Sequence, residues 1–266
     1  MEQYAKVLKR LEALELGSTS IGRGHIDGLI LSNGTDADHD INIAAGEAKD
    51  SENTYLLQLS SVLTKRLDAA WAVGTDQGGL DTGAIAASKT YHVYLIRKDS
   101  DGTIDALFSL SVSAPTMPAG WSTWRRIGSV LTNSSANILG FAQYGDTFWY
   151  KTPTFDVNVT NQGTSRINYV LSVPLGVAVL AKMNLRLTNA AITTLYLCCP
   201  DLTDLPPIHD GSPLYTIICM SAESGYGYQL ECQTNTSSQI SARAKNENSG
   251  LRIAVLGWVD PRGKNA

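Results

Sequence analysis

Charged residues are scarce in this chain. Lys and Arg number 21 and Asp and Glu number 25 among 266 residues, which leaves a charged fraction of 17% and a formal net charge of −4. Proteins that coat nucleic acid carry a positive excess, so we expect no nucleic-acid partner. An average soluble domain has about 25% charged residues. Ser, Thr, Asn and Gly must therefore cover much of this surface, which is typical of β-rich, externally exposed proteins.

Cysteine and long apolar runs are also limited. The cysteines are Cys198, Cys199, Cys219 and Cys232. They lack the CxxC or Cys/His spacing of a zinc site, and their apolar neighbours predict buried, unpaired residues of a protein assembled in a reducing cytoplasm. The longest apolar stretch, residues 169–180, is broken by Ser172 and Pro174 and is too short to cross a bilayer. We therefore expect no export signal and no membrane insertion.

Motifs for metal, phosphate or catalysis are incomplete. Residues 36–47 place acids at positions 1, 3, 5 and 12 of an EF-hand loop, but Ile41 stands where the sharp turn needs glycine. Residues 74–83 are rich in glycine yet lack the lysine of a phosphate loop. We interpret both segments as loops of a β protein. None of the four histidines has a nucleophile signature beside it, so we expect no catalytic residue, no metal and no other cofactor.

The first twenty residues have a helical pattern. Tyr4, Val7, Leu11 and Leu14 follow the a/d spacing of a coiled coil, with charged residues around them. Two heptads are marginally stable alone in water, so this stripe must pack on sister chains, on a docking partner or on the chain's own body. Because residues 17–24 form a Gly/Ser-rich joint, we favour self-association or docking.

From His25 onward the pattern changes to short runs of period two between turn residues. Residues 91–96 and 103–110 predict a hairpin joined through Asp101-Gly102. Further strands are expected at 28–31, 40–43, 55–59 and 126–131. Residues 63–71 fit either a helical turn or a strand.

A domain boundary is predicted near residue 150, because Pro153 interrupts the chain and a fresh alternation starts at 155–159. The runs beyond it are 167–173, 176–180, 184–187, 193–198, 215–220, 226–232, 239–243 and 251–259. Their rhythm is that of a β-sandwich or jelly roll. The sequence therefore predicts a mainly β protein with an N-terminal amphipathic helix and hinge over 1–24 and two antiparallel β domains over 25–150 and 151–266.

Large aromatic residues cluster near the predicted boundary. They are Trp121, Trp124, Trp149 and Tyr150. They could form a sugar-stacking platform or fill the seam between the two β domains, and we favour the seam, since large aromatics usually bury at such borders.

Several long motifs resemble those of a known family. They lie at 26–29, 31–33, 40–46, 63–74, 77–81, 90–93 and 125–129. Together they are similar to a domain of tail, fibre and other virion-associated proteins of bacteriophages and prophages. The similarity covers about 23–150, with a weaker match at 256–263.

The resemblance implies a structural or host-recognition component of a virion, assembled in the bacterial cytoplasm. It implies a homotrimer whose residues 1–20 dock on another virion protein while the β domains bind a host-surface glycan or protein. Three copies would multiply weak contacts into avidity. A capsid decoration or head-fibre protein and a glycan-processing enzyme are the alternatives, and the resemblance carries over no catalytic residue.

Overall fold

The computed structural model describes residues 21–208, 217–219 and 226–264, and this part of the chain is mainly β, as predicted. The predicted helix with Tyr4, Val7, Leu11 and Leu14 lies outside the described residues. In the part that is described, no helix is long and apolar enough to cross a membrane.

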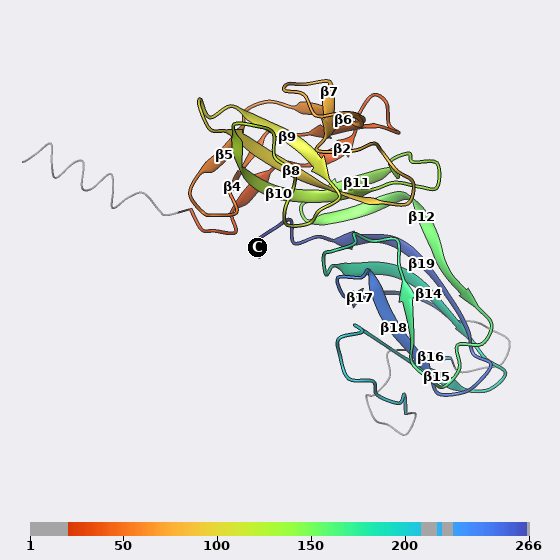
Figure 1. Ribbon diagram of the computed structural model, residues 1–266. Coiled ribbons are helices and arrows are strands. Elements are labelled where there is room, and N and C mark those ends of the chain that lie inside the picture. Colours follow the sequence, from red (N-terminus) through yellow and green to blue (C-terminus); the bar gives the residue numbers. More distant parts are fainter. Residues whose placement is uncertain (1–20, 209–216, 220–225, 265–266) are drawn as a thin grey trace, which may run out of the picture.

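The strands form two bodies. The first contains β1 (Ile26–Gly28), β2 (Leu31–Asn33), β3 (Asp40–Ile43), β4 (Gly46–Lys49), β5 (Leu56–Leu59), β6 (Leu63–Ala70), β7 (Gln77–Leu80), β8 (Thr90–Lys98), β9 (Ile104–Ser109), β10 (Trp121–Leu131) and β11 (Phe141–Tyr144). The second contains β13 (Ile167–Val170), β14 (Leu180–Thr188), β15 (Thr193–Cys198), β16 (Ile217–Cys219), β17 (Tyr226–Gln233), β18 (Gln239–Ala244) and β19 (Gly250–Val259). Strand β12 (Thr147–Val159) belongs to both and runs from one body into the other (Figure 1).

One sheet continues through the two bodies. Its order is β10-β8-β9-β7-β6-β3-β2-β11-β12-β19-β14-β17. The three-stranded sheet β1-β4-β5 completes the first body, and the four-stranded sheet β13-β18-β15-β16 lies opposite β12, β19, β14 and β17 in the second, which is therefore sandwich-like (Figure 1).

Strand β12 crosses the predicted boundary at residue 150. It pairs with β11 through Thr147–Tyr150 and with β19 on both sides of a register shift between Trp149 and Thr154. Pro153 lies within this shift, where proline's missing N–H breaks no ladder hydrogen bond. The interruption in the sequence pattern is thus an irregularity within one strand.

The β8–β9 hairpin is confirmed, with His92 opposite Ser109 and Arg97 opposite Ile104. Residues 63–70 form strand β6, in which Leu63, Lys65 and Leu67 face inward.

Two pairings depart from the antiparallel prediction, because β7 is parallel to both β6 and β9. The glycine-rich loop permits this approach. A Cβ at Gly78 would lie 2.0 Å from the Ala70 carbonyl oxygen, and one at Gly79 would lie 2.6 Å from the Phe108 ring. A strand was also predicted at 28–31, but Gly28 and Leu29 have positive φ, and the chain turns there between β1 and β2.

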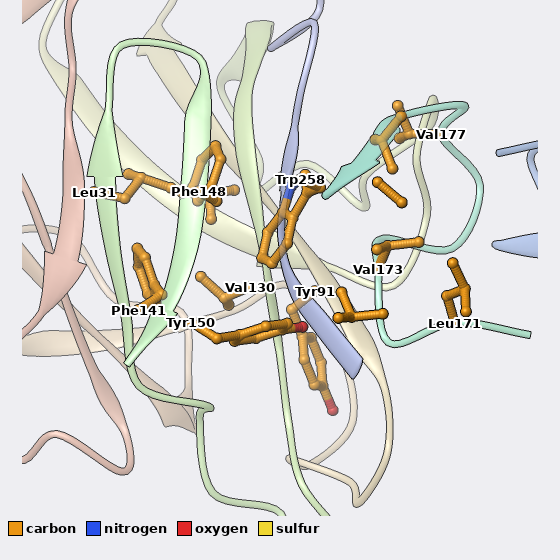
Figure 2. Close-up of a cluster of buried hydrophobic side chains, with 14 of the residues drawn as sticks. Leu31, Tyr91, Val130, Phe141, Phe148, Tyr150, Leu171, Val173, Val177 and Trp258 are labelled. Carbon is orange, nitrogen blue, oxygen red and sulfur yellow. The ribbon is translucent and has the colours of Figure 1, made fainter. Parts of the chain in front are cut away.

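One hydrophobic cluster extends through both bodies. At the seam Trp258 stacks on Phe148, with ring centroids 5.0 Å apart, and also contacts Tyr150. Figure 2 shows Trp258 beside Phe148 and Tyr150, with Val173 and Val177 from the second body nearby. The seam prediction is confirmed for Tyr150, whose hydroxyl donates to the Ser172 carbonyl.

The other three tryptophans from the predicted seam lie elsewhere. Trp121 is buried in a separate cluster with Tyr94, and Trp124 packs against that cluster. Trp149 is half-buried, with the Lys182 ammonium 5.2 Å from its ring centroid.

The C-terminal segment after β19 returns to the first body and closes a buried polar network there. The Arg126 guanidinium donates to both carboxylate oxygens of Asp260 and to the Ser129 hydroxyl, which also hydrogen-bonds His92 Nδ1. Arg262 donates to backbone carbonyls of the first body, including that of Ile127. We call Arg126, Ser129, His92 and Asp260 the junction network.

Candidate functional site

The outer face of the second body's larger sheet carries the site that we consider most suited to binding. Along β14, Ala181, Met183 and Leu185 are buried in the sandwich, so the alternate residues point outward. The outward residues on this and neighbouring strands are Trp149, Phe155, Asn158, Lys182, Asn184, Arg186, Gln229, Glu231 and Arg252. We call this surface the outer trough.

Two arginines lie side by side on adjacent strands of the trough. The register places Arg186 directly opposite Arg252, and Asn158 opposite Arg252 on the other side. The Asn158 side-chain oxygen accepts a hydrogen bond of 3.1 Å from Arg252 Nε. Within the described residues, no carboxylate forms an ion pair with either arginine. Like charges directly opposite each other destabilise a sheet, so this pair concentrates positive charge at a structural cost that an anionic ligand would offset.

The neighbouring row of cross-strand partners adds amide groups and an aromatic ring. Asn184 pairs with Gln229 on one side and with Ala254 on the other, and Phe155 lies beyond Ala254. The Phe155 side chain is 60% exposed. Amide groups both donate and accept hydrogen bonds, and an exposed ring provides an apolar face, so the row suits the mixed surface of a sugar.

The last row is electrically balanced. Lys182 lies opposite Glu231, and their side chains form an ion pair. Since the Lys182 ammonium also covers one face of Trp149, the tryptophan is not free on that face for sugar stacking. The unbalanced charge of the trough therefore lies at the Arg186–Arg252 end.

Three shallow hollows follow one another along these rows. The hollow at the arginine end has a volume of about 230 Å³, the middle one beside Phe155 about 370 Å³, and the one beside Trp149 about 290 Å³. Arg186 and Arg252 line the first two, and Gln229 lines the second and third. The hollows thus form an extended surface, which suits several units of a polymer better than one small molecule.

A larger groove of about 620 Å³ lies between the bodies. Thr154 and Ser238 line it, and their buried hydroxyl oxygens have no hydrogen-bond partner in the part of the chain that the structure describes. The groove offers polar contacts to a ligand, but its lining has no concentration of charge comparable to the arginine pair.

The segment that resembles an EF-hand is a hydrogen-bonded turn. Asp36 accepts from the Asp38 N–H, and Asp40 accepts from the Asp36 N–H. The hydrogen bond between Asp36 and His39 lowers the pKa of Asp36 and raises that of His39. No group of three or more potential metal ligands occurs among the described residues.

The other candidate residues have simple structural positions. Cys198, Cys199 and Cys232 are buried and unpaired, and burial raises the pKa of the Cys232 thiol to about 12. The side chain of Cys219 and the predicted docking residues Tyr4, Val7, Leu11 and Leu14 lie outside the described part.

Sequence reasoning missed the trough, although the alternation of Lys182, Asn184 and Arg186 with apolar residues was a readable signal of a charged outer face.

Comparisons with known proteins identify no family. The sequence matches no protein-family model. The search of curated proteins finds no match. A search of solved structures finds the infectious bursal disease virus VP2 subviral particle, with 11% sequence identity and a TM-score of 0.17, over 87% of this chain and 70% of that one. A TM-score this low supports no conclusion about fold or function.

Proposed function

We propose that this chain is a structural virion protein of a bacteriophage, of the tail-fibre or receptor-binding type. We further propose that its outer trough holds an acidic glycan of the host surface without chemical change. The motifs over 23–150 that resemble phage virion proteins support the setting. The Arg186–Arg252 couple, which has no carboxylate partner among the described residues, is the observation that carries the ligand class, since guanidinium groups bind carboxylates through paired, charge-assisted hydrogen bonds.

Glycan binding is tested by immobilising polygalacturonate, with uncharged dextran as the comparison polymer. We expect the protein to be retained by polygalacturonate and not by dextran. In the Arg186→Gln/Arg252→Gln variant, loss of about 1 kcal/mol per guanidinium contact predicts binding about thirtyfold weaker. Equal retention on both polymers, or full retention of the variant, would contradict the proposed site.

A matched control removes the same amount of charge elsewhere. Arg66 and Lys98 are exposed on the first body, with 49% and 42% of their side-chain surfaces accessible. The Arg66→Gln/Lys98→Gln variant has the same net charge as the trough variant. It should bind polygalacturonate like the unaltered protein, and weakening equal to that of the trough variant would point to net charge instead of a site.

The virion role is tested on phage particles. Immunogold labelling at the tail, together with inhibition of adsorption by the purified protein, is the expected result. Labelling of the head without such inhibition would support a capsid decoration or head-fibre protein instead. Release of reducing sugars from host polysaccharide would support a glycan-processing enzyme and overturn the proposal.

The proposal includes a homotrimer joined through Tyr4, Val7, Leu11 and Leu14, with residues 1–20 also docking on another virion protein. Three linked troughs would bind a repeating polymer with avidity. Light scattering should give a trimer for the full chain and a monomer for a chain lacking residues 1–20. A monomeric full chain would exclude the trimer, and a shortened chain that stays trimeric would assign the association to the β bodies.

A further inference from the structure

A second cavity, remote from the outer trough, is lined by a buried arginine. It has a volume of about 360 Å³ and lies where β10 meets residues 176–178 of the second body and the C-terminal segment. Arg125 lines it and is only 1% exposed. Its Nε and Nη2 atoms are buried and have no hydrogen-bond acceptor within the described part of the chain. We call this space the junction cavity.

The surroundings of Arg125 have an excess of positive charge. Burial is the largest cause of the lowered pKa of Arg125, and the nearby charges of Arg126 and Arg262 lower it further. Asp260 is engaged by Arg126 through both carboxylate oxygens. Asp50, the carboxylate that favours charged Arg125, accepts hydrogen bonds from two N–H groups of its own turn and forms no ion pair with it. A buried guanidinium normally has a carboxylate partner, and none of the described residues supplies one to Arg125.

The rest of the lining is largely apolar. Trp124, Val112, Val177 and Pro261 contribute to the walls, and the exposed Ser113 also lines the cavity. Small-molecule sites usually combine such walls with a few polar groups that fix the ligand's orientation. The lining therefore complements a molecule with an acidic end and a flat or apolar body.

We propose that the junction cavity binds a small organic carboxylate whose acid group accepts hydrogen bonds from the Arg125 guanidinium. Trp124 and Val177 contact the body of this ligand. The carboxylate belongs either to a free acid or to an acidic sugar. Because this site shares no residue with the outer trough, its occupation is independent of the function proposed above.

The test uses the full chain and NMR titrations, observed on both the ligands and the protein, with benzoate, glucuronate, glucose and inorganic phosphate. We expect benzoate or glucuronate to bind and to shift the Arg125 Nε–H resonance, while glucose and phosphate bind at least about tenfold more weakly. Tighter binding of benzoate identifies a free apolar acid, and tighter binding of glucuronate identifies an acidic sugar. Equal binding of phosphate, or no binding of either carboxylate, would overturn the proposal.

Two variants separate the site from general folding effects. Arg125→Met should weaken carboxylate binding at least about tenfold. Ser113→Trp fills the cavity from an exposed position and leaves Arg125 in place, so it should also abolish binding even if Arg125→Met fails to fold. Ser134→Trp, at an exposed turn elsewhere, is its matched control and should bind normally. Unchanged binding in Ser113→Trp would place the ligand elsewhere and refute the assignment.

The Arg186→Gln/Arg252→Gln variant completes the design. It should bind the small carboxylate like the unaltered protein, since it alters only the trough. Loss of small-carboxylate binding in that variant would show that the probes bind at the trough and would overturn the junction cavity as their site. If the unaltered protein is not retained by polygalacturonate but still binds the small carboxylate, the trough proposal fails and the junction cavity stands.

Discussion

Mild acid should destabilise the protein through one histidine. His92 is 1% exposed, and its Nδ1 lies 2.9 Å from the Ser129 hydroxyl. Burial lowers the pKa of His92 to about 4, and the neighbouring Arg126 guanidinium acts in the same direction. In the unfolded chain the imidazole titrates near its ordinary pKa of 6.5. Between these two values the unfolded state binds a proton that the folded state excludes.

The sign and size of the effect follow from that difference. The contribution of His92 to the unfolding free energy is fully present above pH 6.5 and is lost as the pH decreases from 6.5 towards 4. A difference of about 2.5 pKa units corresponds to about 3 kcal/mol of unfolding free energy across that interval. The carboxylates with shifted pKa values, and His39, titrate outside it. The raised pKa of His39 affects stability above pH 6.5, and the lowered pKa of Asp260 affects it below pH 3.8.

Urea unfolding at pH 7, 6, 5 and 4.5, followed by tryptophan fluorescence, measures this dependence. His92→Gln should have a lower stability at pH 7 but a nearly flat profile down to pH 4.5. His39→Gln, at a half-buried histidine of the first body, should retain the decline of the unaltered protein. The reasoning is refuted if the unaltered protein is as stable at pH 4.5 as at pH 7. It is also refuted if His92→Gln loses as much unfolding free energy between pH 7 and pH 4.5 as the unaltered protein loses.

Two further substitutions test the packing of the first body. Asp260→Asn leaves the buried Arg126 guanidinium without its carboxylate and should lower the unfolding free energy by about 3–5 kcal/mol in denaturant titrations; a loss below 1 kcal/mol would show that the pair is dispensable. Gly78→Ala forces a Cβ to within 2.0 Å of the Ala70 carbonyl oxygen and should cost about 2 kcal/mol, measured as a lower thermal midpoint. An unchanged midpoint would show that β7 shifts freely relative to β6.

Local patterns in the sequence predicted many of the local elements, although the chain turns within the strand predicted at 28–31 and forms no strand at 176–179. The β8–β9 hairpin depends on alternation and an Asp-Gly turn a few residues away, and β15 has the predicted bounds of Thr193–Cys198. The parallel position of β7 was not predictable in this way. It depends on the close backbone approach that Gly78 permits, and a glycine-rich run by itself indicates only a loop.

The candidate sites depend on register and on long-range pairing, which a single sequence does not specify. Arg186 and Arg252 are opposite each other only because β14 and β19 pair with the observed offset. Asp260 meets Arg126 across a separation of 134 residues. Alternation along β14 indicates that Arg186 faces outward, but nothing local identifies the neighbour that shares its row.

The return of the C-terminal segment to the first body has a consequence for synthesis. The ribosome finishes β10 long before it reaches Asp260 and Arg262, which lie 134 and 135 residues beyond their partners Arg126 and Ile127. During translation, the Arg126 guanidinium therefore has no carboxylate partner from Asp260, and the carbonyls that accept hydrogen bonds from Arg262 lack this donor. The contacts of the first body are complete only when the last of these residues has emerged, so we expect a chain terminated before Asp260 to be less stable than the full chain.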